Sequence, residues 1–390
     1  MTEQELKTAL AELAEVRSDA EPIVSLYLDA HWSDERQRDR ARLYVRDAVR
    51  LAVDRHGAHP QLEALRRTLG RVAAEAGQHT EQVGEASHQG LAIFACESLG
   101  VWRVLSAPRP FKPELCVDGR PHLLQLARLA GDARPAVIAF VQDDGAQVYE
   151  VSLGTILSEA AVQRPVARDS DAARGRKSRR HGEELIDRVR REAIEAVRQV
   201  WERAPQTQLV LVGTKQRTSA FERALPERMR AKVLARLPRP PGKASRKGNG
   251  KAELLGRVME KVIAHERAAA PGQVKDVIAE AMRGGLAVLG SEDVVLAVNE
   301  RRVHRLILEE DFEASGWRCR NCDALGTTHD ERCSFCQGPL ARVDSLGEEL
   351  VGRTLAEEGE LEVVPHDHRL HAYRGVAALL RQAHASRLPG

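Results

Sequence analysis

The sequence predicts a mixed α/β protein with more than one domain. Its 390 residues exceed the roughly 150 that a single domain usually holds. Short apolar runs typical of buried strands alternate with longer amphipathic stretches typical of helices, and this succession favours an α/β arrangement. Two closely spaced cysteine pairs near the C-terminus predict a small metal-binding element within it.

The N-terminal part is predicted to place two strands among helices. Apolar residues at helical spacing indicate a helix over 3–17, and β-forming residues predict a strand over 22–28. Amphipathic helices are expected over 34–53 and 61–76, and a second strand over 90–95. Together these segments predict a first α/β unit.

The middle part begins with a predicted hairpin. Strands over 136–141 and 146–151 flank the turn sequence Asp143-Asp144-Gly145. A long amphipathic helix is expected over 183–203, and a buried strand over 208–213. The later segments continue the alternation: helices over 221–237 and 250–281, an apolar run over 294–298, a strand over 303–308, a helix over 349–358, a strand over 361–364, and an apolar run over 376–382.

The charges of the chain nearly cancel. There are 59 Lys and Arg residues against 57 Asp and Glu residues, which gives a formal net charge of +2. This balance excludes an acidic disordered chain and a uniformly basic coat protein. No apolar run reaches the roughly 18 residues of a membrane span, and the first residues are polar. We therefore expect a cytoplasmic protein with no membrane partner.

Two Cys-x-x-Cys motifs separated by ten residues form the strongest local motif, and its members are Cys319, Cys322, Cys333 and Cys336. Four thiolates at this spacing predict one tetrahedral zinc site, with a redox pair as the alternative. Four protein ligands leave no open position for water, so the ion is expected to be structural. His329 is a possible substitute ligand, and Cys96 and Cys116 are expected to be ordinary buried thiols.

A segment without any acidic residue precedes the long predicted helix. Its cationic members are Arg174, Arg176, Lys177, Arg179, Arg180 and His181. A basic loop at a helix N-terminus presents both cations and free N–H groups to phosphate, which favours RNA binding, while a solvated loop is the alternative. A second run without acids, 236–251, is interpreted as a flexible basic linker.

No catalytic group is predicted. The sequence contains no glycine-rich nucleotide loop, and no Ser or Cys nucleophile is paired with a histidine by a local signature. The carboxylate pair Asp143-Asp144 is better interpreted as a turn. The C-terminal histidines His366, His368 and His371 could bind metal, but surface histidines are the simpler interpretation. We therefore expect a binding protein rather than an enzyme.

Several segments resemble a known family. They are Ile23-Val24-Ser25-Leu26-Tyr27-Leu28, Gly90-Leu91-Ala92-Ile93-Phe94, Arg109-Pro110-Phe111-Lys112-Pro113, residues 290–308, the cysteine motif, and the stretch 373–381. Their order is similar to that of the archaeal and eukaryotic class-one peptide chain release factors and their relative Pelota. It resembles more closely the bacterial branch, which includes the Balon-type ribosome hibernation factors.

The resemblance implies three domains. The first, 1–130, would be an N-terminal α/β domain on the decoding-centre side. The second, 131–285, would be an α/β domain carrying the basic loop 164–184 and the long helix. The third, 286–390, would be an α/β domain with an inserted zinc ribbon over 317–340.

The sequence lacks the motifs that carry out the two reactions of the family, peptidyl-tRNA hydrolysis and codon reading. Release factors of this family carry Gly-Gly-Gln on the loop before the long helix, but 164–184 lacks it, and Gln163 lies only at its edge. The codon-reading Asn-Ile-Lys-Ser would fall at 35–42 and is missing, while Tyr-x-Cys-x-x-x-Phe would fall at 114–120, where Cys116 alone is kept. Both stop-codon reading and ester hydrolysis would therefore need other groups.

The resemblance implies a factor that binds the ribosomal A site and rRNA without reading a codon or cutting peptidyl-tRNA, in hibernation or protection of idle ribosomes. Its basic loop would reach toward the peptidyl-transferase centre. Its third domain would dock near the factor-binding side, with elongation factor Tu or another translational GTPase as partner and the factor itself a monomer. One alternative is a rescue peptidyl-tRNA hydrolase that uses Gln163 or another group. The other is a zinc-ribbon adaptor for protein partners only.

Overall fold

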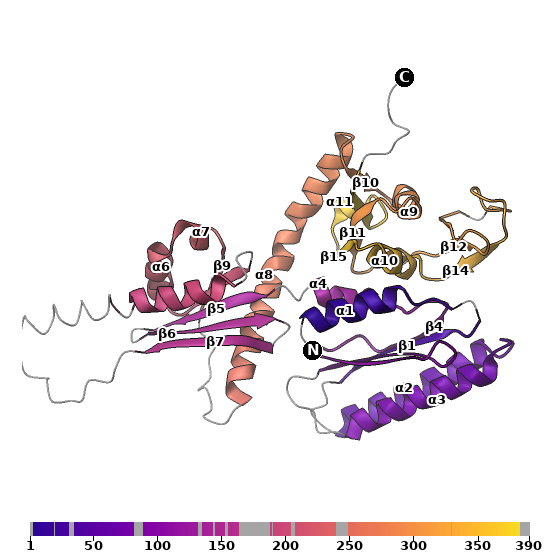
Figure 1. Ribbon diagram of the computed structural model, residues 1–390, viewed down its shortest axis with the longest axis horizontal. Coiled ribbons are helices and arrows are strands. Elements are labelled where there is room, and N and C mark those ends of the chain that lie inside the picture. Colours follow the sequence, from indigo (N-terminus) through magenta and orange to yellow (C-terminus); the bar gives the residue numbers. More distant parts are fainter. Residues whose placement is uncertain are drawn as a thin grey trace, which may run out of the picture. The chain divides into compact units, whose positions relative to one another are not determined.

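The computed structural model confirms the mixed α/β class (Figure 1). It describes residues 3–18, 20–30, 35–81, 89–131, 135–142, 145–152, 155–163, 188, 190–203, 207–238, 249–328 and 330–382. The chain forms two compact units, one made of 3–132 and 266–390 and the other of 133–265. The boundaries of the three domains expected from the sequence stay predictions.

The first unit opens with a four-stranded antiparallel sheet in the order β3-β2-β1-β4. Its strands are β1 (Ile23–Asp29), β2 (Gly90–Cys96), β3 (Val101–Ala107) and β4 (Glu114–Asp118). Helices α2 (Glu35–Arg55) and α3 (Leu62–Glu81) cover one face, and α1 (Glu3–Ala14) and α4 (Leu124–Gly131) lie on the other (Figure 1). Because both faces are covered, β1 is buried along almost its whole length, which explains its run of apolar residues.

A second sheet of the same unit has the order β10-β16-β11-β15. Its strands are β10 (Ala287–Leu289), β16 (Val376–Leu380), β11 (Val303–Glu309) and β15 (Glu360–Val364). Strands β11 and β15 run parallel, whereas the other pairs are antiparallel. The associated helices are α9 (Ser291–Asn299), α10 (Leu346–Ala356) and α11 (His368–His371), and α10 also packs against α1 and α4. Helix α10 therefore joins the two sheets into one unit.

The cysteine motif lies in a separate three-stranded antiparallel sheet of the order β13-β12-β14, between β11 and α10 in the chain. Its strands are β12 (Gly316–Cys319), β13 (Leu325–Gly326) and β14 (Leu340–Val343). This insertion corresponds to the ribbon expected over 317–340.

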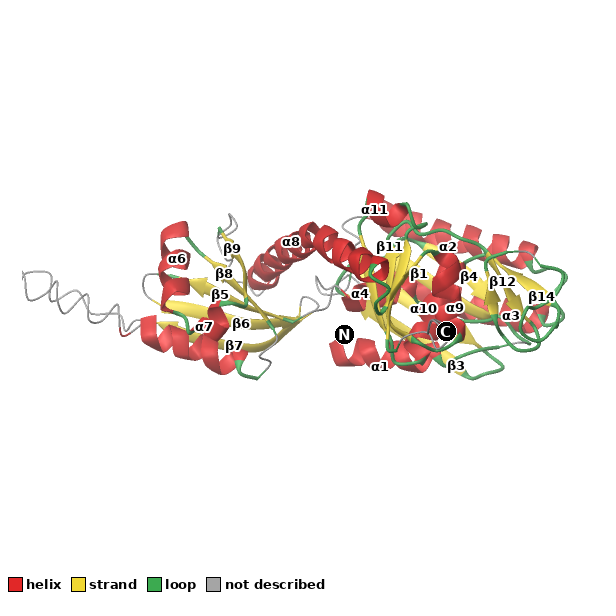
Figure 2. Cartoon of the chain, turned by 90° about the horizontal axis from the view of Figure 1, so that it is seen from above, coloured by secondary structure: helices red, strands yellow, loops and turns green. Residues whose placement is uncertain are grey.

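The second unit is built on a five-stranded sheet of the order β7-β6-β5-β8-β9, seen from above in Figure 2. Its strands are β5 (Ala136–Val141), β6 (Gly145–Ser152), β7 (Thr155–Gln163), β8 (Gln208–Val212) and β9 (Val233–Leu237). The antiparallel β5–β6 register confirms the expected hairpin, although Asp143 and Asp144 lie outside the described residues. Strand β8 pairs in parallel with β5, and β9 pairs in parallel with β8.

Successive side chains of β5 point to opposite faces of the sheet, and each face contributes to a separate hydrophobic core. Val137, Ala139 and Val141 pack with the helix over 190–201, α6 (Lys215–Ala224) and α7 (Glu227–Arg230). The intervening β5 residues instead pack against the N-terminal part of α8 (Asn249–Met282). The C-terminal part of α8 packs on the sheet that contains β11.

The helix expected over 221–237 is wrong. Helix α6 ends at Ala224 because Pro226 cannot donate a backbone hydrogen bond and forces the preceding Leu225 into an extended conformation, with ψ of 146°. Residues 233–237 then pair with β8 as strand β9. The apolar run over 294–298 lies inside helix α9.

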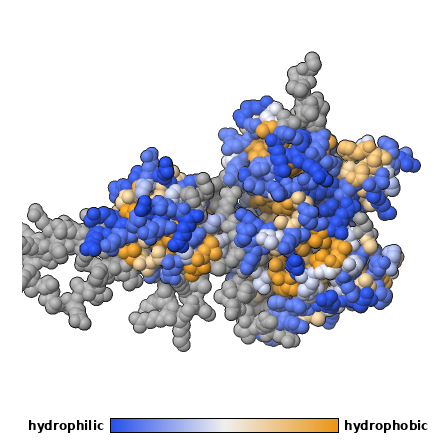
Figure 3. All heavy atoms as spheres, viewed as in Figure 1, coloured by the Kyte–Doolittle hydropathy of each residue, from blue (hydrophilic) through white to orange (hydrophobic). Residues whose placement is uncertain are grey.

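No helix among the residues that the structure describes has both the length and the apolar character needed to cross a membrane. The face shown in Figure 3 is mostly hydrophilic, with smaller apolar areas between the charged side chains.

Candidate metal centre and nucleic-acid interface

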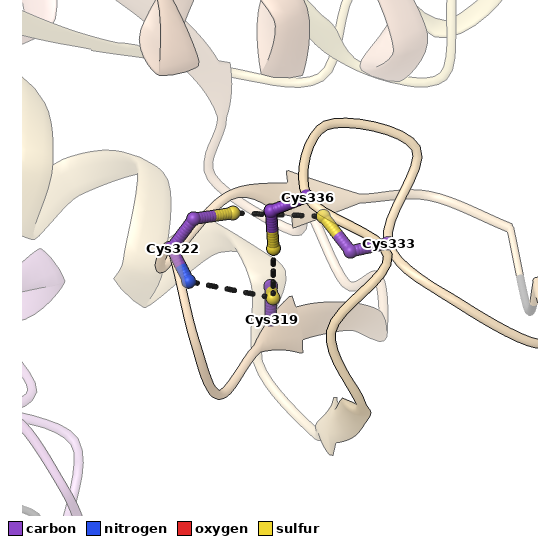
Figure 4. Close-up of side chains that lie close together, drawn as sticks. All are labelled: Cys319, Cys322, Cys333 and Cys336. Carbon is purple, nitrogen blue, oxygen red and sulfur yellow. Dashed lines mark hydrogen bonds between the residues drawn. The ribbon is translucent and has the colours of Figure 1, made fainter.

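The four cysteines of the ribbon converge on one point (Figure 4). All four sulfur atoms lie within 4.8 Å of one another. The Sγ atoms of Cys319 and Cys336 are 3.4 Å apart, and those of Cys322 and Cys333 are 3.6 Å apart. Four sulfurs placed tetrahedrally around Zn²⁺ at about 2.3 Å would be about 3.8 Å from one another. The donor set and its spacing therefore fit zinc.

The two Cys-x-x-Cys turns share one backbone design. In each, the residue after the second cysteine has a positive φ, 64° at Asp323 and 60° at Gln337, and its N–H donates to the carbonyl of the first cysteine. The N–H groups of Asn321 and Phe335 donate to the Sγ atoms of Cys319 and Cys333 at 3.3 and 3.4 Å. Such donors stabilise thiolates, and they orient the sulfurs inward.

Gly338 makes room for the sulfur cluster. A Cβ atom at this position would lie 3.0 Å from the Sγ of Cys319 and 3.2 Å from that of Cys336. The short Sγ contacts join different knuckles rather than the two cysteines of one motif, which favours one four-thiol site over two redox pairs. His329 lies outside the described residues.

The first knuckle is tied to the N-terminal part of the same unit by a network of charges. The carboxylate of Asp323 contacts Arg17 at 2.7 Å and Arg120 at 3.3 Å, and both arginines come from the N-terminal part. Arg353 of α10 contacts the same carboxylate at 3.2 Å and also donates to the Asp323 carbonyl at 2.6 Å. Burial lowers the pKa of Arg353, against the effect of the neighbouring carboxylates. Glu349, which is 4% exposed, contacts Arg120 and Arg353 at 3.5 Å each.

The expected RNA-binding residues Arg174, Arg176, Lys177, Arg179, Arg180 and His181 lie outside the described residues. The segment that carries them leaves the sheet at Gln163, the last residue of β7, and the described chain is helical again over 190–201. Gln163 pairs with Gly145, so it lies at the sheet end where β5 also finishes.

This sheet end is basic in its described residues. A cavity of about 770 Å³ lies between the ends of β5 and β8 and the first turn of α6. Arg190, Lys215 and Arg217 contribute to its lining, and no acidic side chain is among the lining residues that the structure describes. Thr214 caps α6 by accepting the N–H of Arg217 at 3.4 Å. Cations and a helix N-terminus together provide an environment suited to phosphate.

Sequence reasoning missed a buried polar cluster around His122. Its Nε2 lies 3.3 Å from the carboxylate of Asp118. Burial lowers the pKa of His122, but hydrogen bonds with Asp118 and Cys116 outweigh it and raise the pKa well above its ordinary value. The carboxylate of Glu348 accepts the N–H groups of Leu123 and Leu124 at 2.6 and 3.0 Å, and so caps α4 from another helix. No local signature could indicate this cluster because Glu348 is more than two hundred positions away in the chain.

Two of the three C-terminal histidines have a common neighbour. His366 and His371 lie against the carboxylate of Glu309, whereas His368 is not a member of this group. The sequence contained no signal for Glu309, since a single acidic residue at the end of a strand is not distinctive.

Comparison with known proteins places the second unit in a family context. Residues 121–267 match the model of the bacterial archaeo-eukaryotic release factor family 10. This match confirms the release-factor-like family predicted from the sequence, over the segment that it covers. A search of curated proteins found no match.

Solved structures give further similarities. The archaeal translation termination factor aRF1 is 16% identical, with 98% of this chain and 99% of that chain covered and a TM-score of 0.26. Pelota of Archaeoglobus fulgidus is 18% identical, with 75% and 78% covered and a TM-score of 0.34. Archaeal Pelota, in a model of ribosome-bound Pelota and ABCE1, is 14% identical, with 98% and 94% covered and a TM-score of 0.41.

Proposed function

We propose that the chain is a ribosome-binding translation factor that occupies the A site, neither reads a codon nor hydrolyses peptidyl-tRNA, and protects idle ribosomes. One observation carries the proposal. Strand β7 ends at Gln163, before the basic segment with Arg174 to His181, at the sheet end where Arg190, Lys215 and Arg217 line a cavity, and all of these residues fall inside the stretch that matches the release factor family. In the release factors that the sequence resembles, the Gly-Gly-Gln loop precedes the long helix of the middle domain.

The basic end of the second unit would hold rRNA through its phosphates. Lys and Arg side chains that neutralise phosphates release counterions, so such binding weakens as salt rises. Arginine is suited to this contact because its guanidinium can donate two parallel hydrogen bonds to phosphate oxygens.

The sequence itself supports the absence of hydrolysis. The segment 164–184 has no Gly-Gly-Gln, and Gln163 is paired in the β6–β7 ladder rather than placed on the loop. A reaction that relies on a positioned water needs its positioning group at the reacting atoms.

The ribbon is proposed to hold one structural Zn²⁺ through Cys319, Cys322, Cys333 and Cys336. The ion would fix the fold of the ribbon and leave no coordination position for substrate. Phe335, between the last two ligands, is 58% exposed and would offer an aromatic contact to a protein partner such as a translational GTPase.

Cosedimentation with purified 70S ribosomes at several salt concentrations tests the proposal. We expect binding at low salt that weakens as salt rises. Replacing Arg176, Lys177, Arg179 and Arg180 with Ala should lower the affinity and reduce the salt slope by up to about 1 per lost phosphate contact. A matched control replaces four exposed cations of the other unit with Ala, namely Lys275, Arg283, Arg301 and Arg342, and should bind normally. Absence of binding at low salt would favour the adaptor alternative instead.

Release of peptidyl-tRNA in the same mixtures tests the second half of the proposal. We expect no release above the rate of ribosomes alone. Release that requires the factor and disappears in Gln163→Ala would instead identify a rescue hydrolase.

A further inference from the structure

The carboxyl ends of the parallel strands β11 and β15 bring four potential metal ligands together. Glu309 is the last residue of β11 and pairs with Val364, the last residue of β15. Asp311 follows β11, His366 follows β15, and His371 ends the short helix α11. Loops that leave adjacent parallel strands meet at one edge of the sheet, where ligands of α/β proteins commonly bind.

The ligand atoms of this group lie close to one another. The Nδ1 atom of His371 is 3.0 Å from Oε2 of Glu309, and Nδ1 of His366 is 3.8 Å from Oε1 of the same carboxylate. The Nδ1 of His366 is also 3.7 Å from Oδ2 of Asp311. The two imidazole rings are 4.8 Å apart. Ligands about 2.1 Å from a common ion would be about 3.0–3.4 Å apart, and the ligand atoms of Glu309, His366 and His371 already lie within 4.8 Å of one another.

Glu309 is held in place by its surroundings. Its side chain is 2% exposed, and the N–H of Asp367 donates to its Oε1 at 2.9 Å. Gly375 gives the carboxylate room, because a Cβ there would lie 2.7 Å from Oε2. The carboxylate is thereby aimed at the two histidines.

The arrangement of ligand atoms suits a cation between these groups. Both histidines turn Nδ1, rather than Nε2, toward carboxylate oxygens. A neutral ring with its proton on Nδ1 donates to the carboxylate, as His371 does to Glu309 at 3.0 Å, whereas the other tautomer turns the Nδ1 lone pair inward as a ligand for a divalent cation. Two carboxylates would balance the charge of one such cation.

We propose that Glu309, His366 and His371, with Asp311 beside His366 as a fourth ligand, form a second metal site, separate from the cysteine ribbon. Two imidazoles and two carboxylates suit a first-row divalent ion such as Mn²⁺, Fe²⁺, Co²⁺ or Zn²⁺. A cavity of about 490 Å³ is lined by Glu309, Asp311 and His371 among others. It leaves space for exchangeable water on the ion, in contrast to the closed four-cysteine site. The proposal does not depend on ribosome binding.

Cobalt titration of the full chain, with its ribbon first loaded with zinc, tests the site. Thiolates hold Zn²⁺ more tightly than Co²⁺, so the ribbon should not exchange. We expect one Co²⁺ per chain, with visible absorption that lacks sulfur-to-cobalt charge transfer. His366→Ala and His371→Ala should each weaken binding by at least about tenfold.

His368→Ala is the matched control, because this exposed histidine is close in sequence but is not a member of the group. It should bind Co²⁺ as the natural chain does. Thermal unfolding without Co²⁺ should be similar for all three variants, which separates ligand loss from misfolding. The proposal is overturned if the natural chain takes up no Co²⁺, if the absorption shows thiolate ligation, or if His371→Ala and His368→Ala bind equally well.

Discussion

The carboxylate of Asp323 lies 2.7 Å from the guanidinium of Arg17, and this ion pair joins the first Cys-x-x-Cys turn to the loop between α1 and β1. Arg120 and Arg353 converge on the same carboxylate, and Glu349 provides the second acid of the network. Asp323 directly follows the ligand Cys322. The backbone turn that positions the cysteine therefore also positions the carboxylate that forms ion pairs with Arg17, Arg120 and Arg353.

Removing this acid should destabilise the unit formed by 3–132 and 266–390. In Asp323→Ala, Arg120 and Arg353 would still share Glu349, but one carboxylate would have to balance the charge of both guanidinium groups, and Arg17 would lose its contact with Asp323. Loss of one partner of a fully buried pair costs about 3–5 kcal/mol, and the partial exposure of Asp323 reduces our expectation to about 2 kcal/mol. Urea unfolding measures this difference. The exposed Asp330 of the same ribbon is the control, and Asp330→Ala should change stability little; equal effects of both variants would contradict the role of the network.

The cap that Glu348 provides for α4 is expected to contribute strongly to stability. Glu348→Ala would leave the buried N–H groups of Leu123 and Leu124 without their acceptor, at a cost of about 2–4 kcal/mol. Glu348→Gln keeps a carbonyl acceptor and should cost less, about 1 kcal/mol. Denaturant unfolding of both variants checks this order. If Gln were as damaging as Ala, charge rather than the capping hydrogen bonds would be the dominant contribution.

His122 should make the stability of the same unit depend on pH. Its pKa in the folded chain is well above the ordinary 6.5, so protonation stabilises the fold. This contribution is complete below pH 6.5 and is lost as the pH rises through the raised pKa. The free energy of unfolding should therefore fall on the alkaline side, and His122→Asn should flatten that part of the profile. Burial also raises the pKa of Glu348 above its ordinary 4.5. The stability that depends on its protonated form is therefore also lost as the pH rises, through the raised pKa of this carboxyl group. His304→Asn, at an exposed position of β11, should leave the profile unchanged.

The parts of the fold that depend on local sequence could be predicted. Strand β5 has the expected bounds because a short apolar run is followed directly by a hairpin turn. The cysteine site is likewise local, since its four ligands lie within a short segment of fixed spacing. Strand β9 was not predicted because the residues on both sides of Pro226 favour a helix. Residues 233–237 become a strand only through their pairing with β8.

Contacts between distant segments could not be predicted. Ser345 and Glu348 have the spacing of a local capping box, and Ser345 does cap α10 by accepting the N–H of Glu348 at 3.4 Å. The Glu348 carboxylate, however, caps α4 instead. The same limit applies to Arg17 with Asp323 and to Glu309 with His371, because each pair meets only after the sheets have formed.

Loss of the proposed zinc site should have effects beyond the ribbon. Cys319→Ser is expected to abolish zinc binding and unfold β12 to β14, because a structural ion supplies much of the folding free energy of so small a sheet. Asp323 would then be displaced, and its ion pairs with Arg17 and Arg120 would be lost. We expect hydrogen exchange to rise in the ribbon and also near Arg17 and in α10, while β5 and β8 of the other unit keep their protection. Cys96→Ser, at a thiol outside the cluster, should retain zinc. Increased exchange confined to the ribbon would show that the ion pairs do not couple the zinc site to the N-terminal sheet.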